Sequence, residues 1–247
     1  MSIDDDADLL GLTRIGRVVG EALKAMAANV RPGITTAELD DIGAREFARH
    51  GARSAPMLFK DFPGVNCISL NDAAVHGIPN DTALRPGDTV KLDVTGELDG
   101  YVADSALTLT VPPVSDKKRR IARAAEDAFW RGCHAARAGR PIYEIGRAVD
   151  SEVRRHGFTV LRELHSHGVG RTIHEEPNVP MYMDRRANSL LTEGLVITIE
   201  PIISAGSPWV AADPDGWTLR TADGSLSAHY EHTIVITKDR PLVITQV

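Results

Sequence analysis

The chain has 247 residues, a length that one α+β, α/β or all-β domain can reach, and its 43% apolar and 25% charged residues are ordinary for a globular protein. Its net charge of −6 argues against the basic surface of a nucleic-acid-binding protein, and two cysteines are too few for a disulfide framework. The N-terminal sequence lacks a signal-peptide pattern and no apolar run reaches roughly 18 residues, so we expect a cytoplasmic protein without membrane contact.

The first part of the chain predicts helices followed by strands. Apolar side chains at helical spacing between residues 15 and 26 indicate one buried helix face. Thr35 and Glu38 have the spacing of a capping box, which would open a second helix that ends near Gly51. The elements expected next are a strand over residues 65–70 and a loop over residues 71–79.

The stretch from Lys91 to Ser105 predicts a β-hairpin. Asp99-Gly100 lies between two arms rich in β-branched and apolar residues, which is a strong signal for a two-residue turn. Strands paired across this turn would make Asp93 and Asp104 diagonal neighbours on one face, with side chains roughly 7 to 8 Å apart. That spacing would accommodate metal ions, although two solvated acids beside a turn would give the same local sequence.

The second part of the chain repeats this order. Placing residues 31–51 on residues 137–157 gives seven identities in 21 positions, which indicates an internal duplication; chance similarity between two amphipathic helices is the alternative. The expected elements are helices over 121–138 and 142–157, and short strands around His167 and over 195–203, 217–219, 229–237 and 242–246. Two such halves favour an α+β domain with one shared antiparallel sheet and helices on its outer face.

Acidic residues stand where strand interiors should be apolar. Glu200 ends the run from Leu195 to Ile199, and Glu231 leads directly into another apolar run. A buried, ionised carboxylate is costly unless it is paired or binds a metal, although either residue alone could be a strand-end acid that reaches solvent. Four carboxylates and one imidazole form the candidate set: Asp93, Asp104, His167, Glu200 and Glu231. This oxygen-rich set suits Co, Mn, Fe(II) or Zn, and suits two ions that share carboxylates better than one tetrahedral zinc.

Five motifs follow one another along the chain. They are CISLNDAAVHGIP at 67–79, LDVTGELDGYVADS at 92–105, SHGVGRTIHEEP at 166–177, ITIEP at 197–201 and WTLRTADGSLSAHYEHT at 217–233. In these motifs and their order the chain resembles the type I methionine aminopeptidases, in their simple bacterial form, over essentially its whole length. The resemblance implies a pita-bread fold, with a curved antiparallel sheet covered by helices on its outer face. It also implies one catalytic domain over residues 1–247, with pseudo-twofold halves at about 8–115 and 116–247.

The resemblance assigns a role to each candidate residue. It implies that Asp93 binds one of two metal ions, that His167 and Glu200 bind the other, and that Asp104 and Glu231 bridge them. His76 and His174 would flank the scissile amide; with Glu200 as the general base, they form the expected catalytic set. The residues expected to surround the methionine side chain are Phe59, Phe62, Cys67 and Trp217, for which core packing is the alternative interpretation.

The activity implied by the resemblance is removal of the N-terminal methionine from nascent proteins and peptides by a metal-bridging hydroxide, with a small second residue preferred. It implies a monomer that works near the ribosome without a nucleic-acid site of its own. A non-catalytic pita-bread binding module is the alternative, although such modules typically lose metal ligands. Two departures from the family pattern are Val102-Ala103, where His-Gly is usual, and Ser166, where Gly is usual. Residues around metal ligands tune metal affinity, so these departures could alter efficiency.

Overall fold

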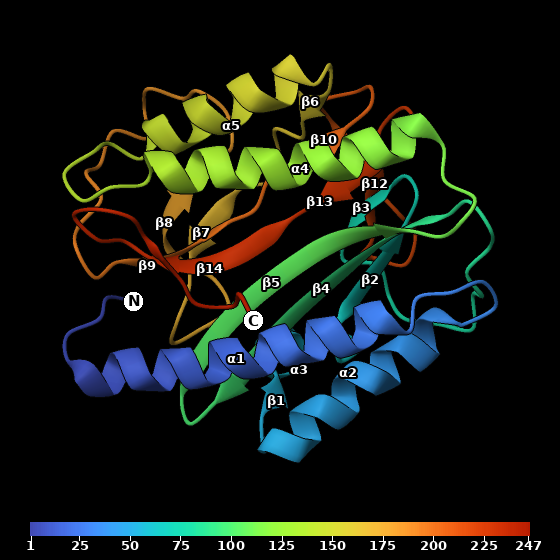
Figure 1. The fold of residues 1–247 in the computed structure, drawn as a ribbon, viewed down its shortest axis with the longest axis horizontal. Coiled ribbons are helices and arrows are strands. Elements are labelled where there is room, and N and C mark those ends of the chain that lie inside the picture. The colour runs from blue at the N-terminus through green and yellow to red at the C-terminus, as the bar shows by residue number, and fades with distance from the viewer.

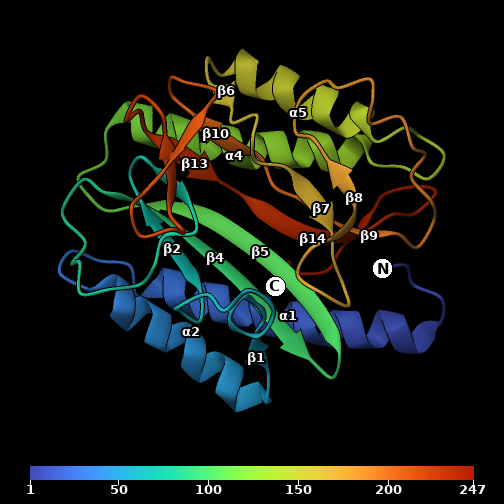
Figure 2. The same cartoon turned by 180° about the vertical axis from the view of Figure 1, so that it is seen from behind.

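Two pairs of helices lie across one face of a twisted, antiparallel sheet in the computed structural model, which describes residues 1–247 (Figure 1). α1 (Asp6–Ala28) and α2 (Thr36–His50) form one pair, and α4 (Asp116–Ala135) and α5 (Tyr143–Arg155) form the other. Seen from behind, the opposite face of the sheet carries no such helix layer (Figure 2). No helix combines the length and apolar composition that a membrane crossing requires.

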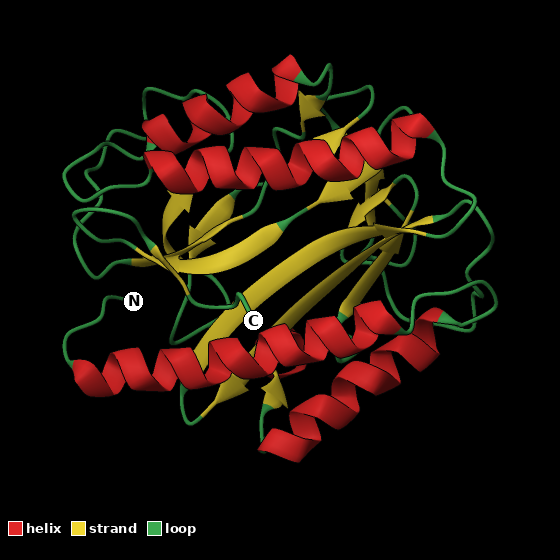
Figure 3. Cartoon of the chain, viewed as in Figure 1, coloured by secondary structure: helices red, strands yellow, loops and turns green.

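The main sheet has nine strands, and all of its strand pairs are antiparallel (Figure 3). Its order is β1-β4-β5-β14-β9-β7-β8, with β2 paired to β4 and β15 paired to β14. Its strands are β1 (Arg53–Ser54), β2 (Cys67–Leu70), β4 (Thr89–Leu98), β5 (Tyr101–Thr110), β7 (Ser166–Gly168), β8 (Glu175–Val179), β9 (Val196–Ile199), β14 (Glu231–Val235) and β15 (Leu242–Val243). The two small sheets contain β3 (Ala73–Val75), β6 (Thr159–Val160), β10 (Ile202–Ser204), β11 (Val210–Ala212), β12 (Leu219–Thr221) and β13 (Ser227–His229).

The helix predictions are confirmed, with shifted ends. The capping box of α2 is present: the Glu38 backbone N–H donates to the Thr35 hydroxyl, and the Glu38 carboxylate accepts from the Thr35 backbone N–H. α4 begins at Asp116, before the first residue of the expected helix, because the Ser115 side chain caps that end. The short helix α3 (Ala55–Lys60) was not predicted; the hydroxyl of Ser54 caps it.

The strand predictions differ from the structure where one strand was expected and two are found. The segment 195–203 divides into β9 and β10 at Glu200-Pro201, and the segment 229–237 divides into β13 and β14 at Tyr230. Proline has no backbone N–H for a ladder hydrogen bond, which favours the first break. The loop prediction for 71–79 was wrong at β3, which pairs with β12. This pairing is long-range, so no local turn signal indicates it.

The core consists mainly of two hydrophobic clusters. The larger has 24 buried residues, chiefly from α1, α2, β4 and β5, and the second has 22, chiefly from α4, α5, β9 and β14. Helix packing therefore consolidates one face of the sheet, which leaves the other face available for polar side chains. The internal duplication and the boundary near residue 115 stay predictions.

Candidate metal centre and active site

The β4–β5 hairpin places the two aspartates as its sequence predicted. Leu98 pairs with Tyr101, and the turn residues Asp99 and Gly100 have φ angles of 53° and 80°, as a two-residue hairpin turn requires. Asp93 lies opposite Ala106 and Asp104 lies opposite Thr95, so the two carboxylates are diagonal neighbours on one face. A Cβ on Gly96 would lie 3.1 Å from Phe47 of α2, so Gly96 faces the helices. Because strand side chains alternate, the aspartates face away from them.

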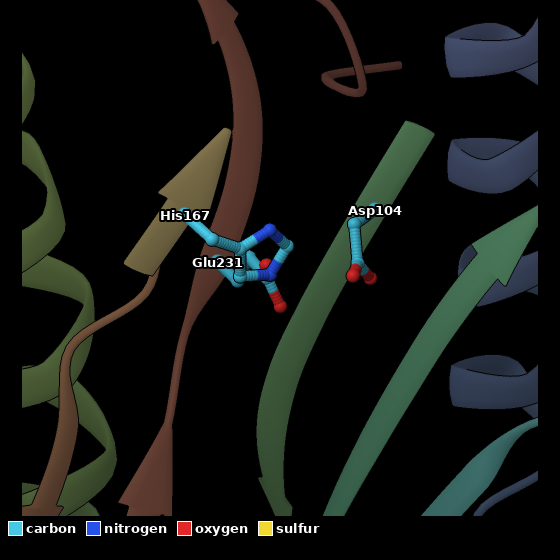
Figure 4. Close-up of side chains that lie close together, drawn as sticks. All are labelled: Asp104, His167 and Glu231. Atoms are coloured by element: carbon cyan, nitrogen blue, oxygen red, sulfur yellow. The ribbon is translucent and has the colours of Figure 1, made fainter. Parts of the chain in front are cut away.

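A cavity of about 360 Å³ lies on this side of the hairpin, away from the four long helices. All five predicted ligands line it: Asp93, Asp104, His167, Glu200 and Glu231. Figure 4 shows three of them, with His167 beside Glu231 and Asp104 on the neighbouring strand β5. One ligand atom each from Asp104, His167 and Glu231 lies within 4.8 Å of the others, and Glu200, His229 and Glu231 form a second such group.

The imidazole of His167 is oriented for ligand binding. Its Nδ1 lies 2.8 Å from the backbone carbonyl oxygen of Gly168, which accepts a hydrogen bond when Nδ1 carries the proton. Nε2 is then unprotonated and lies 3.4 Å from Oε1 of Glu200. A backbone acceptor on the far nitrogen is the usual partner of a metal-binding histidine. Burial is the largest cause that lowers the pKa of His167 to about 3, and the nearby His174 is the second. The ring is therefore neutral near pH 7, and the lone pair of Nε2 stays available.

Burial raises the pKa of every carboxyl group in the set. Burial is the largest cause of the increase to about 7 for Asp104, while hydrogen bonds such as that from the Thr95 hydroxyl oppose it. The pKa values of Asp93, Glu200 and Glu231 are raised well above their usual range, first by burial and then by neighbouring carboxylates that include Asp104. Glu231 Oε1 is buried without a hydrogen-bond partner. Crowded, desolvated oxygens of this kind fit one or more divalent cations.

The two predicted catalytic histidines also line the cavity. The rings of His174 and His167 meet edge to face with centroids 4.3 Å apart. Burial is the largest cause that lowers the pKa of His76, and the positive charge of Lys60 lowers it further. The same two causes lower the pKa of His174 to about 4. Both rings are therefore neutral near pH 7, and each can donate one N–H and accept one hydrogen bond.

Three of the four predicted methionine-pocket residues lie together. Phe62, Cys67 and Trp217 line the cavity, and the Phe62 and Trp217 rings meet edge to face with centroids 5.2 Å apart. The structure does not bring Phe59 to them: its side chain is 38% exposed on α3 and does not line the cavity. The helix α3 was not predicted, so its outward face could not be assigned from the sequence.

Sequence reasoning missed the role of His229 in the cavity wall. It is 1% exposed, with Nε2 3.3 Å from Oε2 of Glu231 and 3.8 Å from Oε2 of Glu200. The signal was present: His229 precedes Glu231 by two residues, the spacing of side chains on one strand face. The expected strand over residues 229–237 would place both side chains on one face, so this local signal was available.

The departures from the family pattern are buried beside the site. Ser166 is fully buried, and its hydroxyl oxygen accepts the backbone N–H of Glu200 at 2.8 Å. Glycine could not make this contact, so Ser166 holds Glu200 through its backbone. Val102 and Ala103 are fully buried in the larger hydrophobic cluster, and the Val102 N–H donates to the Gly170 carbonyl at 2.8 Å. That bond links the hairpin to the segment that carries His174.

Comparisons with known proteins find relatives along the whole chain. Residues 11–238 match metallopeptidase family M24. The chain is 42% identical over 248 residues to methionine aminopeptidase 2 of Bacillus subtilis (strain 168), with 100% of each sequence covered. A methionine aminopeptidase structure from Rickettsia prowazekii has a TM-score of 0.95 at 36% identity, covering 99% of this chain and 100% of that one. One from Thermotoga maritima has a TM-score of 0.96 at 28% identity, with 100% of both chains covered. The predicted pita-bread fold is thereby confirmed, and the chain belongs to metallopeptidase family M24, in its methionine aminopeptidase branch.

Proposed function

We propose that this chain removes the N-terminal methionine from peptides and nascent proteins, with a preference for a small second residue. The observation that carries the proposal is the meeting of four carboxylates and one imidazole in one cavity, beside an aromatic pocket. The match to methionine aminopeptidases along the full chain supports the same substrate. Monomeric state, work near the ribosome and cytoplasmic location stay predictions.

The donor set supports a site for two divalent ions, Co, Mn, Fe(II) or Zn. Asp93 would bind one, His167 and Glu200 would bind the other, and Asp104 and Glu231 would bridge them. The buried Glu231 Oε1 without a partner and the raised carboxyl pKa values support this assignment, because each marks an oxygen in need of a cation. Such ions supply Lewis-acid chemistry: they polarise a carbonyl group and lower the pKa of water.

The protein groups would divide the remaining work of amide hydrolysis. Glu200 would take the proton of the attacking water, because its carboxylate lines the cavity beside His167, where the proposed ions would hold that water. A neutral His174 would donate a hydrogen bond to the oxyanion that develops on the carbonyl oxygen. His76 would hydrogen-bond the scissile amide nitrogen and orient the departing peptide. The hydrolysis releases methionine and a peptide one residue shorter.

The methionine side chain would lie against Phe62, Cys67 and Trp217. Aromatic faces and edges contact thioether sulfur favourably, and a buried thiol adds a soft apolar surface. Burial raises the pKa of Cys67 well above its usual range, so its thiol is neutral and suits such a wall. Phe59 has no part in this proposed pocket, because its side chain faces outward.

The test is hydrolysis of Met-Ala-Ser by protein reconstituted with Mn, Co or Fe(II), with Leu-Ala-Ser as the matched control. We expect release of methionine from the first peptide and little cleavage of the second. Failure to release methionine with any of these metals would refute the catalytic proposal and leave the non-catalytic binding module. For the bridging roles, Asp104→Asn and Glu231→Gln should lower bound metal per chain and abolish turnover. Unchanged metal content and rate would contradict those roles.

A further inference from the structure

His229 is a buried histidine whose ring nitrogens both lack a hydrogen-bond partner. The Thr108 hydroxyl makes two hydrogen bonds to its backbone: it accepts from the His229 N–H and donates to the His229 carbonyl, each at 2.8 Å. It also pairs with Ile202 between β13 and β10. The strands therefore fix where the ring lies, and the missing partners do not result from a loose chain segment.

The ring of His229 faces two of the proposed metal ligands. Nε2 lies 3.3 Å from Oε2 of Glu231 and 3.8 Å from Oε2 of Glu200. The hydroxyl of Thr198 donates to Oε1 of Glu200, and the backbone of Glu200 is held by Ser166. Neither of these contacts holds Oε2 of either glutamate. The imidazole of His229 is thus placed to orient the two carboxylates toward a common cation.

Two roles are open to such a ring, and its second nitrogen separates them. A histidine that binds metal through Nε2 carries its proton on Nδ1 and donates it to an acceptor, as His167 can to the Gly168 carbonyl. Nδ1 of His229 is buried with no acceptor. The arrangement therefore favours the tautomer with the proton on Nε2, which lies within 4 Å of carboxylate oxygens of Glu231 and Glu200.

We propose that His229 is a positioning residue of the metal centre: its Nε2–H donates to Oε2 of Glu231 and holds the Glu231 and Glu200 carboxylates in their binding geometry. It acts through those carboxylates and binds neither ion itself. The inference rests on the proposed metal site. It extends that site, because it assigns a function to an imidazole outside the five expected ligands.

The test compares His229→Gln with His229→Asn and His229→Leu. The glutamine amide nitrogen can reach the place of Nε2, the asparagine nitrogen reaches only that of Nδ1, and leucine has no donor. Cobalt(II) affinity and stoichiometry are measured by calorimetry, and the visible absorption of the bound ion reports its ligand geometry. We expect His229→Asn and His229→Leu to lose roughly ten- to a hundredfold in cobalt affinity with an altered spectrum, and His229→Gln to retain both.

A matched control is His232→Leu. His232 is a buried imidazole on the same stretch of chain, but it packs against Phe129 of α4 and its Nδ1 lies 2.8 Å from the Thr245 hydroxyl. This variant should lower thermal stability and leave the cobalt spectrum unchanged. If His229→Leu unfolds, the Gln and Asn pair still tests the donor position.

Three results would overturn the inference. Equal cobalt affinity in wild type and His229→Asn would show that the donor is not needed. An equal loss in His229→Gln and His229→Asn would show that only the shape of the ring matters. Complete loss of one bound ion in every variant would make His229 a ligand. Wild-type protein that binds cobalt but releases no methionine would instead refute the proposed function, and the donor comparison would still stand.

Discussion

Replacing Asp104 with asparagine should make the metal-free protein more stable while it damages the metal centre. Asp104 is 5% exposed, and its raised pKa of about 7 means that the folded chain binds a proton more tightly than the unfolded chain. The unfolded carboxyl has a pKa of about 3.9, so a shift of about three units corresponds to about 4 kcal/mol at most. We expect Asp104→Asn to gain about 2 to 4 kcal/mol at pH 8.

The contacts around Asp104 should survive the substitution. The Thr95 hydroxyl donates to Oδ1 at 2.9 Å, and an amide oxygen can accept that bond. The Thr233 hydroxyl bridges the backbone N–H and carbonyl of residue 104, which the substitution does not change. The stability difference should therefore report the lost charge.

The pH dependence gives this prediction its sign. Between about pH 4 and pH 7 the folded wild type binds more protons at residue 104 than the unfolded chain, so this carboxyl lowers stability as the pH rises. The advantage of Asp104→Asn should therefore be largest at pH 8 and vanish toward pH 4. Titrations of distant groups occur in both proteins and cancel in the difference. Asp93, Glu200 and Glu231 lose the repulsion from Asp104 in the variant, so their pKa values fall and they add to its advantage at pH 8.

The assay is urea unfolding of chelator-treated wild type and variant at pH 5, 6.5 and 8, with Glu193→Gln as a surface control. Glu193 is exposed and forms an ion pair with Lys238, so its replacement should change stability by about 0.5 kcal/mol or less at any pH. Manganese at about 100 times its dissociation constant should add about 2.7 kcal/mol to the wild type and less to Asp104→Asn. A metal-free variant that is less stable than wild type at pH 8, or a difference that does not change with pH, would refute the reasoning.

Three further predictions follow from single contacts. Ser166→Ala leaves the buried Glu200 N–H without its acceptor and should lower the free energy of unfolding by about 1 to 3 kcal/mol in urea; an unchanged value would remove the proposed support of Glu200. Gly146→Ala places a Cβ 2.3 Å from the Pro180 carbonyl oxygen, so the melting temperature should fall by several degrees, corresponding to about 1 to 3 kcal/mol, and a wild-type value would contradict this close packing of α5. Trp217→Ala should raise KM for Met-Ala-Ser more than it lowers kcat, because the methionine side chain is the only part of the substrate that the indole would contact. An effect confined to kcat would exclude the proposed pocket.

The hairpin shows why part of the site could be predicted from sequence. A two-residue turn fixes strand register, and strand alternation then fixes the face of every side chain, so Asp93 and Asp104 could be placed together without tertiary information. The start of α2 followed from two side chains close in sequence, Thr35 and Glu38 of its capping box. Local signals were sufficient for both.

The missed features depend on contacts far apart in sequence. β3 is a strand because it pairs with β12, more than a hundred residues later, whereas the Asn-Asp before it and the Gly after it indicate a loop. Phe59 could not be excluded from the pocket, because its exposure depends on how α3 packs. His229 was passed over because it ends β13 in a small sheet, and its approach to Glu200 depends on contacts between segments far apart in the sequence. Sequence periodicity does not indicate which sheet a strand joins.

The junction of β5 with β14 links the stability of the fold to the proposed metal site. Asp93 and Asp104 lie on β4 and β5, whereas Glu231 begins β14, and the β5–β14 ladder contains only the pairs Glu231–Ala106 and His232–Ser105. Crowded carboxylates on the two sides of this short ladder repel one another without a cation. Ions that bind both sides would relieve that repulsion and oppose local opening of the junction, because opening separates their ligands. A substitution that weakens this ladder from the helix side without touching a ligand, such as His232→Leu, should therefore lower resistance to opening of β14 in both forms, while the metal-loaded protein stays more resistant than the metal-free protein.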